Sequence, residues 1–391
     1  MSLRAVAAGL VVVASLATAS GCATAGAAGS ELRFAPLTRW GAQVYPLETL
    51  AYFPTETAHI AWLPGDAATA SPELVVAPTR HRRVVAFDAA DGARRWELET
   101  LGGNAASPVA LPGTDDLVIA SLDGAVYRVN RRNGRVIWRS ERAGHGVAAD
   151  PVVVGQGDAA RIVITSLKNR VAVLSAKDGE IVWFSDREHD AEMTIAGHGG
   201  ALVLGDKVVA GFSDGHVGAW ALEDGARLWL VDLAEGEREF ADVDATPVAV
   251  AGPDGEPLVV VSLHRRGLVA LTADGGDLAW QVRGPGFLSP EHDAGLVVAP
   301  QADGLVWGVE AATGRVLWRT ALGTGQAGDV AMSRKYVFAP SGKDLAVLDR
   351  GSGRVVARWG DGRGLGARPV FAHGELYLLG HSGVVWALEV H

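Results

Sequence analysis

The sequence predicts an all-β protein, an eight-bladed β-propeller of four-stranded antiparallel blades whose ring is closed by an N-terminal strand. Three observations carry this prediction. A Gly-x-x-x-Trp pattern returns six times, and its successive tryptophans lie 38 to 51 residues apart, a period typical of solenoids and propellers. Short apolar runs separated by glycine turns surround each copy. Glycine and proline interrupt the chain too often for helical repeats of the same period.

Each copy of the pattern consists of a strand, a turn and a second strand that carries the tryptophan. Turn dipeptides such as Asp91-Gly92 and Asn133-Gly134 are typical of type I′ hairpins, which require positive φ. We expect the tryptophans to be structural, packed between neighbouring blades over the glycine turns, and not to stack on a ligand. They are Trp96, Trp138, Trp183, Trp229, Trp280 and Trp318, and a seventh copy has Ala357 in the corresponding position.

Two further strands precede each copy. One is an apolar run before a second turn, as in Leu117–Ser121 ahead of Asp123-Gly124. The strand before it is opened by proline, as at Ser107-Pro108 and Asp150-Pro151. Four short antiparallel strands make one propeller blade.

The two ends of the chain complete the blade count. After the seventh copy, residues 369–371, 375–379 and 384–390 supply only three strands. A strand-like piece that carries Trp40, residues 39–44, lies ahead of the first complete unit. We expect this piece to add the missing outer strand to the eighth blade, which closes the ring and removes open sheet edges.

Composition limits the function classes. The 391 residues carry a formal net charge of −10, which argues against nucleic acid as a partner. Cys22 is the only cysteine, so the chain has no intrachain disulfide, no CxxC metal site and no CxxCH haem attachment. The eleven histidines show no HxH or HExxH spacing, and we expect no metal site. No nucleophile elbow or phosphate-binding loop stands out.

The N-terminus predicts export and anchoring. A basic start at residues 1–4 precedes an apolar run at residues 5–19 that is shorter than a membrane span and typical of a signal peptide. Ala19-Ser20-Gly21-Cys22 then resembles the lipobox of bacterial lipoproteins, although leucine is usual where Ala19 stands. The resemblance implies lipidation of Cys22, and Ala23 after it implies sorting to the outer membrane. An ordinary secretory signal with an incidental cysteine is the alternative.

These features divide the chain into three parts. Residues 1–21 are the predicted lipoprotein signal peptide, and residues 22–34 are the lipidated cysteine with a flexible tether. Residues 35–391 form the predicted single propeller domain.

The repeat resembles that of the PQQ-like propeller family, which includes quinoprotein dehydrogenases and the BamB-type lipoproteins of outer-membrane protein assembly. The lipobox, the length and the eight blades resemble the BamB type. That resemblance implies a non-catalytic scaffold without a cofactor, anchored in the outer membrane and facing the periplasm. Its implied partner is a BamA-like barrel protein, bound through its POTRA domains, with nascent outer-membrane proteins as further partners. A PQQ-dependent dehydrogenase and a propeller lipoprotein with another partner are the alternatives.

The resemblance also implies partner-binding residues. Asp242-Val243-Asp244-Ala245-Thr246-Pro247 is similar to a BamB segment whose two aspartates contact the POTRA domains. A second contact segment of the family corresponds to a stretch that carries Met193 and Ile195 but lacks the family's arginine. Both stretches join an outer strand to the next inner strand, so we expect them on one face, in an acidic rim suited to a basic partner. The alternative is that Asp242 and Asp244 cap turns.

Overall fold

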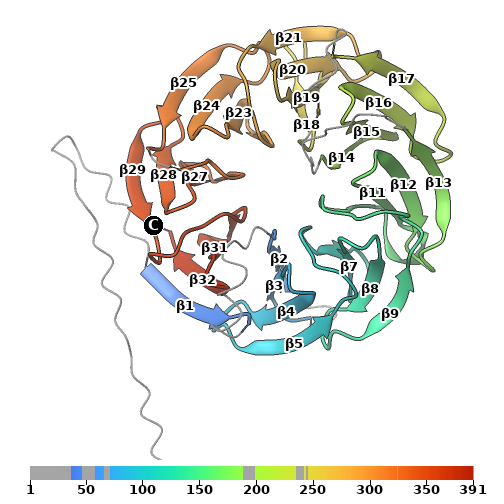
Figure 1. The fold of residues 1–391 in the computed structure, drawn as a ribbon, viewed down its shortest axis with the longest axis vertical. Helices are drawn as coiled ribbons and strands as arrows, with labels where there is room; N and C mark the ends of the chain where they lie inside the picture. Colours follow the sequence, from blue (N-terminus) through green and yellow to red (C-terminus); the bar gives the residue numbers. More distant parts are fainter. Residues whose placement is uncertain are drawn as a thin grey trace, which may run out of the picture.

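The computed structural model describes residues 37–45, 58–65, 71–187, 199–234, 242–243, 245–323 and 325–390. The described residues form eight four-stranded antiparallel sheets arranged around a central axis, as Figure 1 shows. This arrangement confirms the predicted eight-bladed propeller.

Blades 1 to 7 follow one another along the chain, each with its innermost strand first. Blade 1 contains β2 (Ala61–Leu63), β3 (Leu74–Pro78), β4 (Arg83–Asp88) and β5 (Arg94–Glu99). Blade 2 contains β6 (Val109–Leu111), β7 (Asp116–Ala120), β8 (Val126–Asn130) and β9 (Val136–Ser140). Blade 3 contains β10 (Val152–Val154), β11 (Arg161–Thr165), β12 (Arg170–Ser175) and β13 (Ile181–Asp186), with the short 3-10 helix η2 (Gly157–Ala159). Blade 4 contains β14 (Ala201–Leu204), β15 (Lys207–Gly211), β16 (His216–Ala221) and β17 (Arg227–Asp232).

The second half of the ring repeats the same order. Blade 5 contains β18 (Val248–Ala251), β19 (Pro257–Leu263), β20 (Gly267–Thr272) and β21 (Leu278–Val282). Blade 6 contains β22 (Glu291–Asp293), β23 (Leu296–Pro300), β24 (Leu305–Glu310) and β25 (Val316–Ala321). Blade 7 contains β26 (Ala331–Met332), β27 (Tyr336–Pro340), β28 (Leu345–Asp349) and β29 (Val355–Trp359). Blade 8 contains β30 (Val370–Ala372), β31 (Glu375–Leu379), β32 (Val384–Glu389) and, as its outer strand, β1 (Leu37–Gln43).

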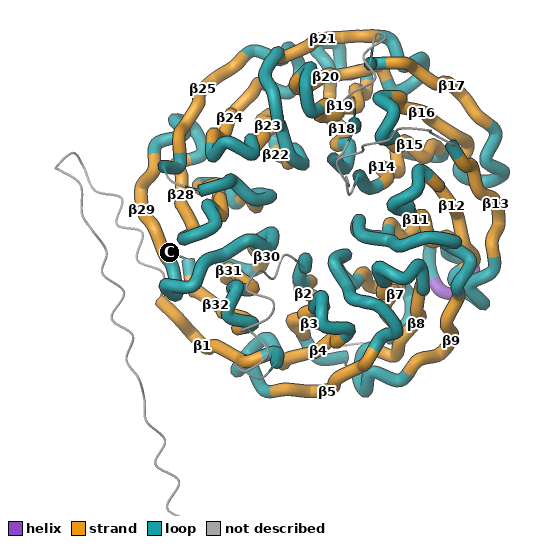
Figure 2. The backbone as a smooth tube through the Cα atoms, in the orientation of Figure 1, coloured by secondary structure: helices purple, strands orange, loops and turns teal. Residues whose placement is uncertain are grey.

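Strand position within a blade explains the hydrophobic pattern. The middle strands lie between two neighbouring blades, so their residues are buried on both faces and read as apolar runs, as in β3 and β23. The outer strands alternate, as in β5, where Trp96 points inward between exposed neighbours. Side chains of adjacent blades therefore form the core between the sheets. Loops connect successive strands, as Figure 2 shows.

The ring closes as predicted. β1 pairs antiparallel with β32, from Leu37 opposite Glu389 to Gln43 opposite Val384. The Gln43 side chain donates to the Ser382 carbonyl at 3.0 Å, and Arg39 forms an ion pair with Glu375 of β31. The first described strand of the chain thus completes the last blade without a covalent link.

The repeat tryptophans contact neighbouring blades. Each indole Nε1 donates to a carbonyl in the outer hairpin of the next blade, at 2.6 to 3.1 Å. The acceptors lie three residues before that hairpin's glycine, and the indole ring covers the glycine. At Gly225, for example, φ is +74°, and a Cβ atom would lie 2.6 Å from the Trp183 ring. Trp40 of β1 makes the same contact with blade 1, through the Ala89 carbonyl.

The exception at Ala357 has a structural reason. Its strand β29 faces blade 8, where β32 and β1 are not joined by a hairpin. Blade 8 therefore has no outer hairpin whose glycine a tryptophan of β29 could cover. Trp359 and Trp386 fill this junction as an edge-to-face pair, with ring centroids 5.8 Å apart.

The predicted type I′ turns are wrong. Such a turn needs positive φ at both central residues. In these hairpins only the glycine has positive φ, because the described non-glycine residues with positive φ are Arg82, Asn169, Ala294 and His373. The hairpin of blade 1 is instead a four-residue loop, in which Gly92 N donates to the Asp88 carbonyl at 2.9 Å and Asp88 N donates to the Ala93 carbonyl.

The antiparallel order gives the ring two distinct faces. On one face lie the outer hairpins that carry the Gly-x-x-x-Trp glycines, together with the first hairpin of each blade. The opposite face carries the middle hairpins and the connections from each outer strand to the next innermost strand; we call it the connection face. The part of the chain that the structure describes contains no helix long and apolar enough to cross a membrane.

Candidate functional site

The axis of the ring is lined by one equivalent position from each blade. This position lies two residues before the innermost strand, at the connection face. Proline follows it in five blades and favours an extended backbone at the preceding residue. The eight residues, in blade order, are His59, Ser107, Asp150, Gly199, Thr246, Ser289, Asp329 and Arg368.

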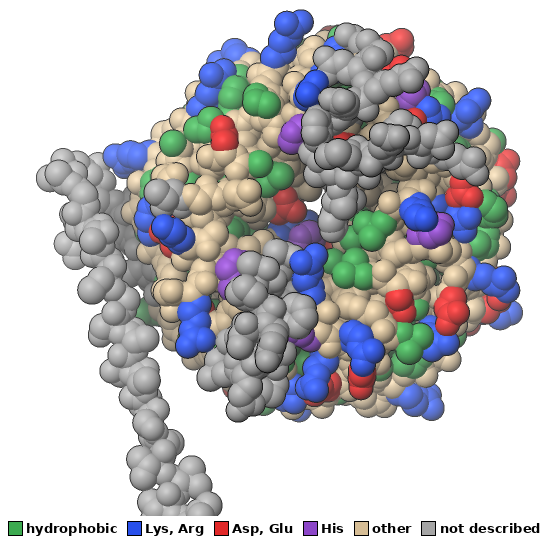
Figure 3. All heavy atoms as spheres, in the orientation of Figure 1, with side chains coloured by type: hydrophobic (Ala, Val, Ile, Leu, Met, Phe, Trp, Pro, Cys, Tyr) green, Lys and Arg blue, Asp and Glu red, His purple; other side chains and the backbone are tan. Residues whose placement is uncertain are grey.

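Six of these eight residues line a cavity of about 560 Å³, and Ser107 and Gly199 are the two that do not. Figure 3 shows acidic, basic and histidine side chains around the opening on the axis. Apolar side chains, among them Val248, Phe287 and Val330, form other parts of the cavity wall. The volume lies within the range of small-molecule sites.

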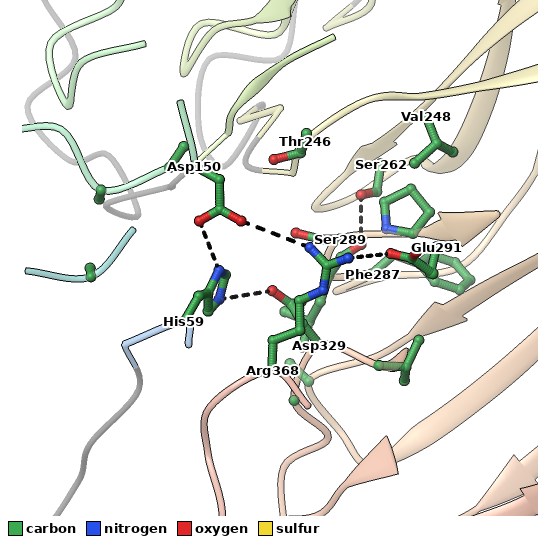
Figure 4. A pocket seen from close by; sticks show the side chains of 18 of the residues that line it. His59, Asp150, Thr246, Val248, Ser262, Phe287, Ser289, Glu291, Asp329 and Arg368 are labelled. Atoms are coloured by element: carbon green, nitrogen blue, oxygen red, sulfur yellow. Dashed lines mark hydrogen bonds and ion pairs between the residues drawn. The ribbon is translucent and has the colours of Figure 1, made fainter. Parts of the chain in front are cut away.

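Five charged side chains form a chain of alternating sign beside this cavity, shown in Figure 4. The order is Asp329, His59, Asp150, Arg368 and Glu291. His59 Nε2 lies 3.6 Å from Asp329, and His59 Nδ1 lies 3.2 Å from Asp150. Arg368 lies 3.9 Å from Asp150 and 2.9 Å from Glu291. Because these residues belong to blades 7, 1, 3, 8 and 6, the contacts tie together parts of the ring that are far apart in sequence.

Burial and neighbouring charges set the protonation of this chain. Burial alone would lower the pKa of His59, but Asp150 and Asp329 outweigh it and raise this pKa above its ordinary value of 6.5. Burial opposes ionisation of Asp150, yet His59, the Ser107 backbone N–H and Arg368 hold its pKa below the usual range. Burial raises the pKa of Glu291 despite Arg368. The geometry therefore favours a charged histidine between two carboxylates.

His59→Gln gives a stability prediction with a definite sign. A raised folded-state pKa means that the stabilisation from His59 is fully present below about pH 6.5 and is lost as the pH rises through the folded-state value. We expect the loss of stability caused by His59→Gln, measured as the shift of the urea midpoint, to be larger at pH 6 than at pH 9. The same substitution at the exposed His145 is the control. An equal shift at both pH values would show that His59 is not held charged in the folded ring.

The structure places only part of the predicted partner site. Met193, Ile195 and Asp244 lie outside the described residues, as does Cys22. Asp242 is described, and its side chain is only 1% exposed. Its backbone carbonyl accepts a hydrogen bond from His264 N at 3.3 Å. Asp242 is therefore buried and does not contribute to an exposed acidic rim.

Sequence reasoning alone misses the charged chain on the axis. From the sequence, Asp150-Pro151 and Arg368-Pro369 are expected only to open strands. The residue before each such proline is the available signal, because six of the eight equivalent positions line the axial cavity. His59 and Asp329 have no such proline and could be found only by counting back from the innermost strand.

Comparisons with known proteins agree with this fold. The sequence profile of the family described as outer membrane protein assembly factor BamB matches residues 80–262 and 249–391. The outer membrane protein assembly factor BamB of Yersinia pestis is 25% identical over 331 residues, which cover 80% of this chain and 81% of that protein. A quinohemoprotein alcohol dehydrogenase, ADH-IIG of Pseudomonas putida, is 21% identical, over 68% of this chain but 41% of the dehydrogenase.

Among solved structures, the crystal structure of BamB from Moraxella catarrhalis superposes with a TM-score of 0.73 at 18% sequence identity, over 91% of this chain and all of that one. This likeness supports the fold. The profile match covers most of the chain, across the repeats of all eight blades. The chain therefore belongs to the family of the outer membrane protein assembly factor BamB.

Proposed function

We propose that this protein is a non-catalytic scaffold of the machinery that assembles outer-membrane β-barrel proteins. Its partner would be a BamA-like barrel protein, bound through POTRA domains, with nascent outer-membrane proteins as transient further partners. Membership of the BamB family is the observation that carries the proposal. A propeller suits this role because rigid blades hold loops of several connections on one face.

The connection face is the proposed docking surface. The stretch with Met193 and Ile195 lies between β13 and β14, and the stretch with Asp242 and Asp244 lies between β17 and β18. Both stretches join an outer strand to the next innermost strand in adjacent blades, and this topology supports the proposal that both contribute to the connection face. Because Asp242 is buried, its proposed part is to hold the second loop in place, while Asp244, Met193 and Ile195 make the contact.

We also propose that Cys22 is lipidated and anchors the protein in the outer membrane, with the propeller in the periplasm. The small residues before Cys22 and the apolar run at residues 5–19 support this. The tether of residues 23–34 would then lead directly to β1, the strand that closes the ring. A BamB-type role requires such placement beside an outer-membrane partner.

The charges on the axis argue against the dehydrogenase alternative. The quinone PQQ carries several carboxylates and would need convergent basic residues, with a carboxylate and amide cluster for calcium. Here the cavity presents Asp150, Glu291 and Asp329, and Arg368, the one arginine among the described residues of its wall, is already paired with Glu291. Within the described ranges no group of three or more His, Cys, Asp or Glu side chains is placed to hold a metal ion. The residues present do not fit this cofactor.

A pull-down from detergent-solubilised outer membranes tests the proposal. We expect the wild-type protein to recover a BamA-like barrel protein. The double variant Met193→Asp with Asp244→Arg should recover at least about tenfold less of it, because loss of an interface anchor typically costs more than about 1.4 kcal/mol of binding free energy. Asp242 is left unchanged because an arginine in its buried position would disturb folding. The control is Asp206→Arg, an exposed residue in the first hairpin of blade 4, on the opposite face. Wild-type capture without any barrel protein would contradict the proposal.

A further inference from the structure

Among the described residues, the five charged side chains in the chain at the axial cavity include one more carboxylate than cationic groups, and His264 also lines the cavity. Asp150, Glu291 and Asp329 face Arg368 and His59. Even with His59 charged, the five side chains leave one negative charge in excess. The pKa of Glu291, which burial and the nearby Asp329 and Asp293 raise, agrees with a site short of positive charge.

Of the three carboxylates, that of Asp329 has the fewest hydrogen-bond donors. Glu291 has Arg368 at 2.9 Å, and Asp150 accepts from His59 and, at 2.6 Å, from the Ser107 backbone N–H. Among the described residues, the ion pair of Asp329 is the contact with His59 Nε2 at 3.6 Å, which is too long for a hydrogen bond, and Arg368 acts on Asp329 only through a longer-range electrostatic attraction. Its side chain is 22% exposed and lines the cavity. A carboxylate in this position retains acceptor capacity for a cationic donor.

The rest of the wall suits a ligand with a hydrocarbon part. Val248, Phe287 and Val330 contribute apolar surface to the same cavity, and its volume of about 560 Å³ accommodates a small molecule. A ligand with a carboxylate would instead meet three carboxylates around the axis. Shape and charge together select an organic cation over an anion.

We propose that the axial cavity binds a small organic cation, with an ammonium group at Asp329 and an alkyl part along Val248, Phe287 and Val330. The ammonium group can belong to a free amine or to a lysine side chain presented at the connection face, and the chemistry of recognition is the same. This cavity shares Thr246 with the connection that carries Asp242 and Asp244, but its test uses the purified protein alone and does not depend on POTRA docking.

Calorimetric titration of the full-length, detergent-solubilised protein tests the site. Cadaverine is the probe, and glutarate, which has the same carbon chain with two carboxylates, is the matched anion. We expect cadaverine to bind and glutarate not to bind. Asp329→Asn removes the charge and keeps the shape of the side chain, so we expect the variant to fold and to bind cadaverine about tenfold more weakly, as for loss of one charge-assisted hydrogen bond. Arg368→Gln should tighten it, because a competing cation is removed, and Asp206→Asn on an exposed hairpin should leave it unchanged.

Nα-acetyl-lysine methylamide distinguishes the two sources of the ammonium group. Tighter binding of this compound assigns the site to a lysine side chain of a protein, and tighter binding of cadaverine assigns it to a free amine. Either result supports the proposal. Glutarate binding above cadaverine, no binding of either amine at millimolar concentration, or full cadaverine affinity in a folded Asp329→Asn variant would each overturn it.

Discussion

A chain that begins at Val44 is expected to melt about 10 °C or more below a chain that begins at Glu31, because it loses β1 and with it the closure of the ring. β1 completes the blade of which β32 is otherwise the outer strand. Trp40 alone, 9% exposed and bonded to the Ala89 carbonyl at 2.9 Å, should account for about 3–5 kcal/mol. The free edge of β32 should also promote aggregation.

Thermal melting followed by circular dichroism makes the comparison. Both chains lack Cys22 and the predicted signal peptide, so they differ only by residues 31–43, most of which form β1. The chain that begins at Glu31 therefore controls for loss of the anchor. Equal melting temperatures for the two chains would show that the ring is as stable without β1 as with it, and closure by this strand would then have no stabilising role.

Trp229→Ala is expected to lower the free energy of unfolding by about 3–5 kcal/mol, the usual cost of removing a buried tryptophan side chain. Trp229 is 8% exposed, donates to the Ala273 carbonyl at 3.0 Å and covers Gly276 of blade 5. The substitution would leave a cavity between blades 4 and 5 and remove the hydrogen bond that joins them.

Urea denaturation of matched variants checks this prediction. The neighbouring Leu228 lies on the same strand but is 46% exposed, so Leu228→Ala should change stability by no more than about 0.5 kcal/mol. A loss of similar size in both variants would mean that the indole acts through strand propensity and not through the contact between blades.

The fold could be predicted because its information is local and repeated. The spacing of Trp96, Trp138 and their counterparts, with a glycine four residues before each, marks the outer hairpins of blades 1 to 6. The three C-terminal strands lacked a fourth, outer strand, and the piece around Trp40 could supply it. Closure of the ring by the N-terminal strand followed from this. The turn type was predicted wrongly because Asp-Gly also suits a four-residue loop in which glycine alone has positive φ.

The axial site could not be predicted in the same way because its contacts exist only in the closed ring. His59 and Asp329 belong to blades 1 and 7, and no local pattern relates them. The burial of Asp242 could not be predicted either, because an aspartate in an acidic stretch of sequence is usually exposed. The contact of its backbone carbonyl with His264 N exists only in the folded ring. Residue type alone does not reveal whether a carboxylate faces solvent or the interior.

Calorimetric titration of the purified protein with the isolated POTRA domains of the BamA-like protein from the same bacterium tests whether the connection face binds these domains. We predict saturable binding with one propeller per set of POTRA domains, abolished by Met193→Asp with Asp244→Arg and retained by Asp206→Arg. Absence of binding to the folded POTRA domains, or equal binding by both variants, would contradict this prediction.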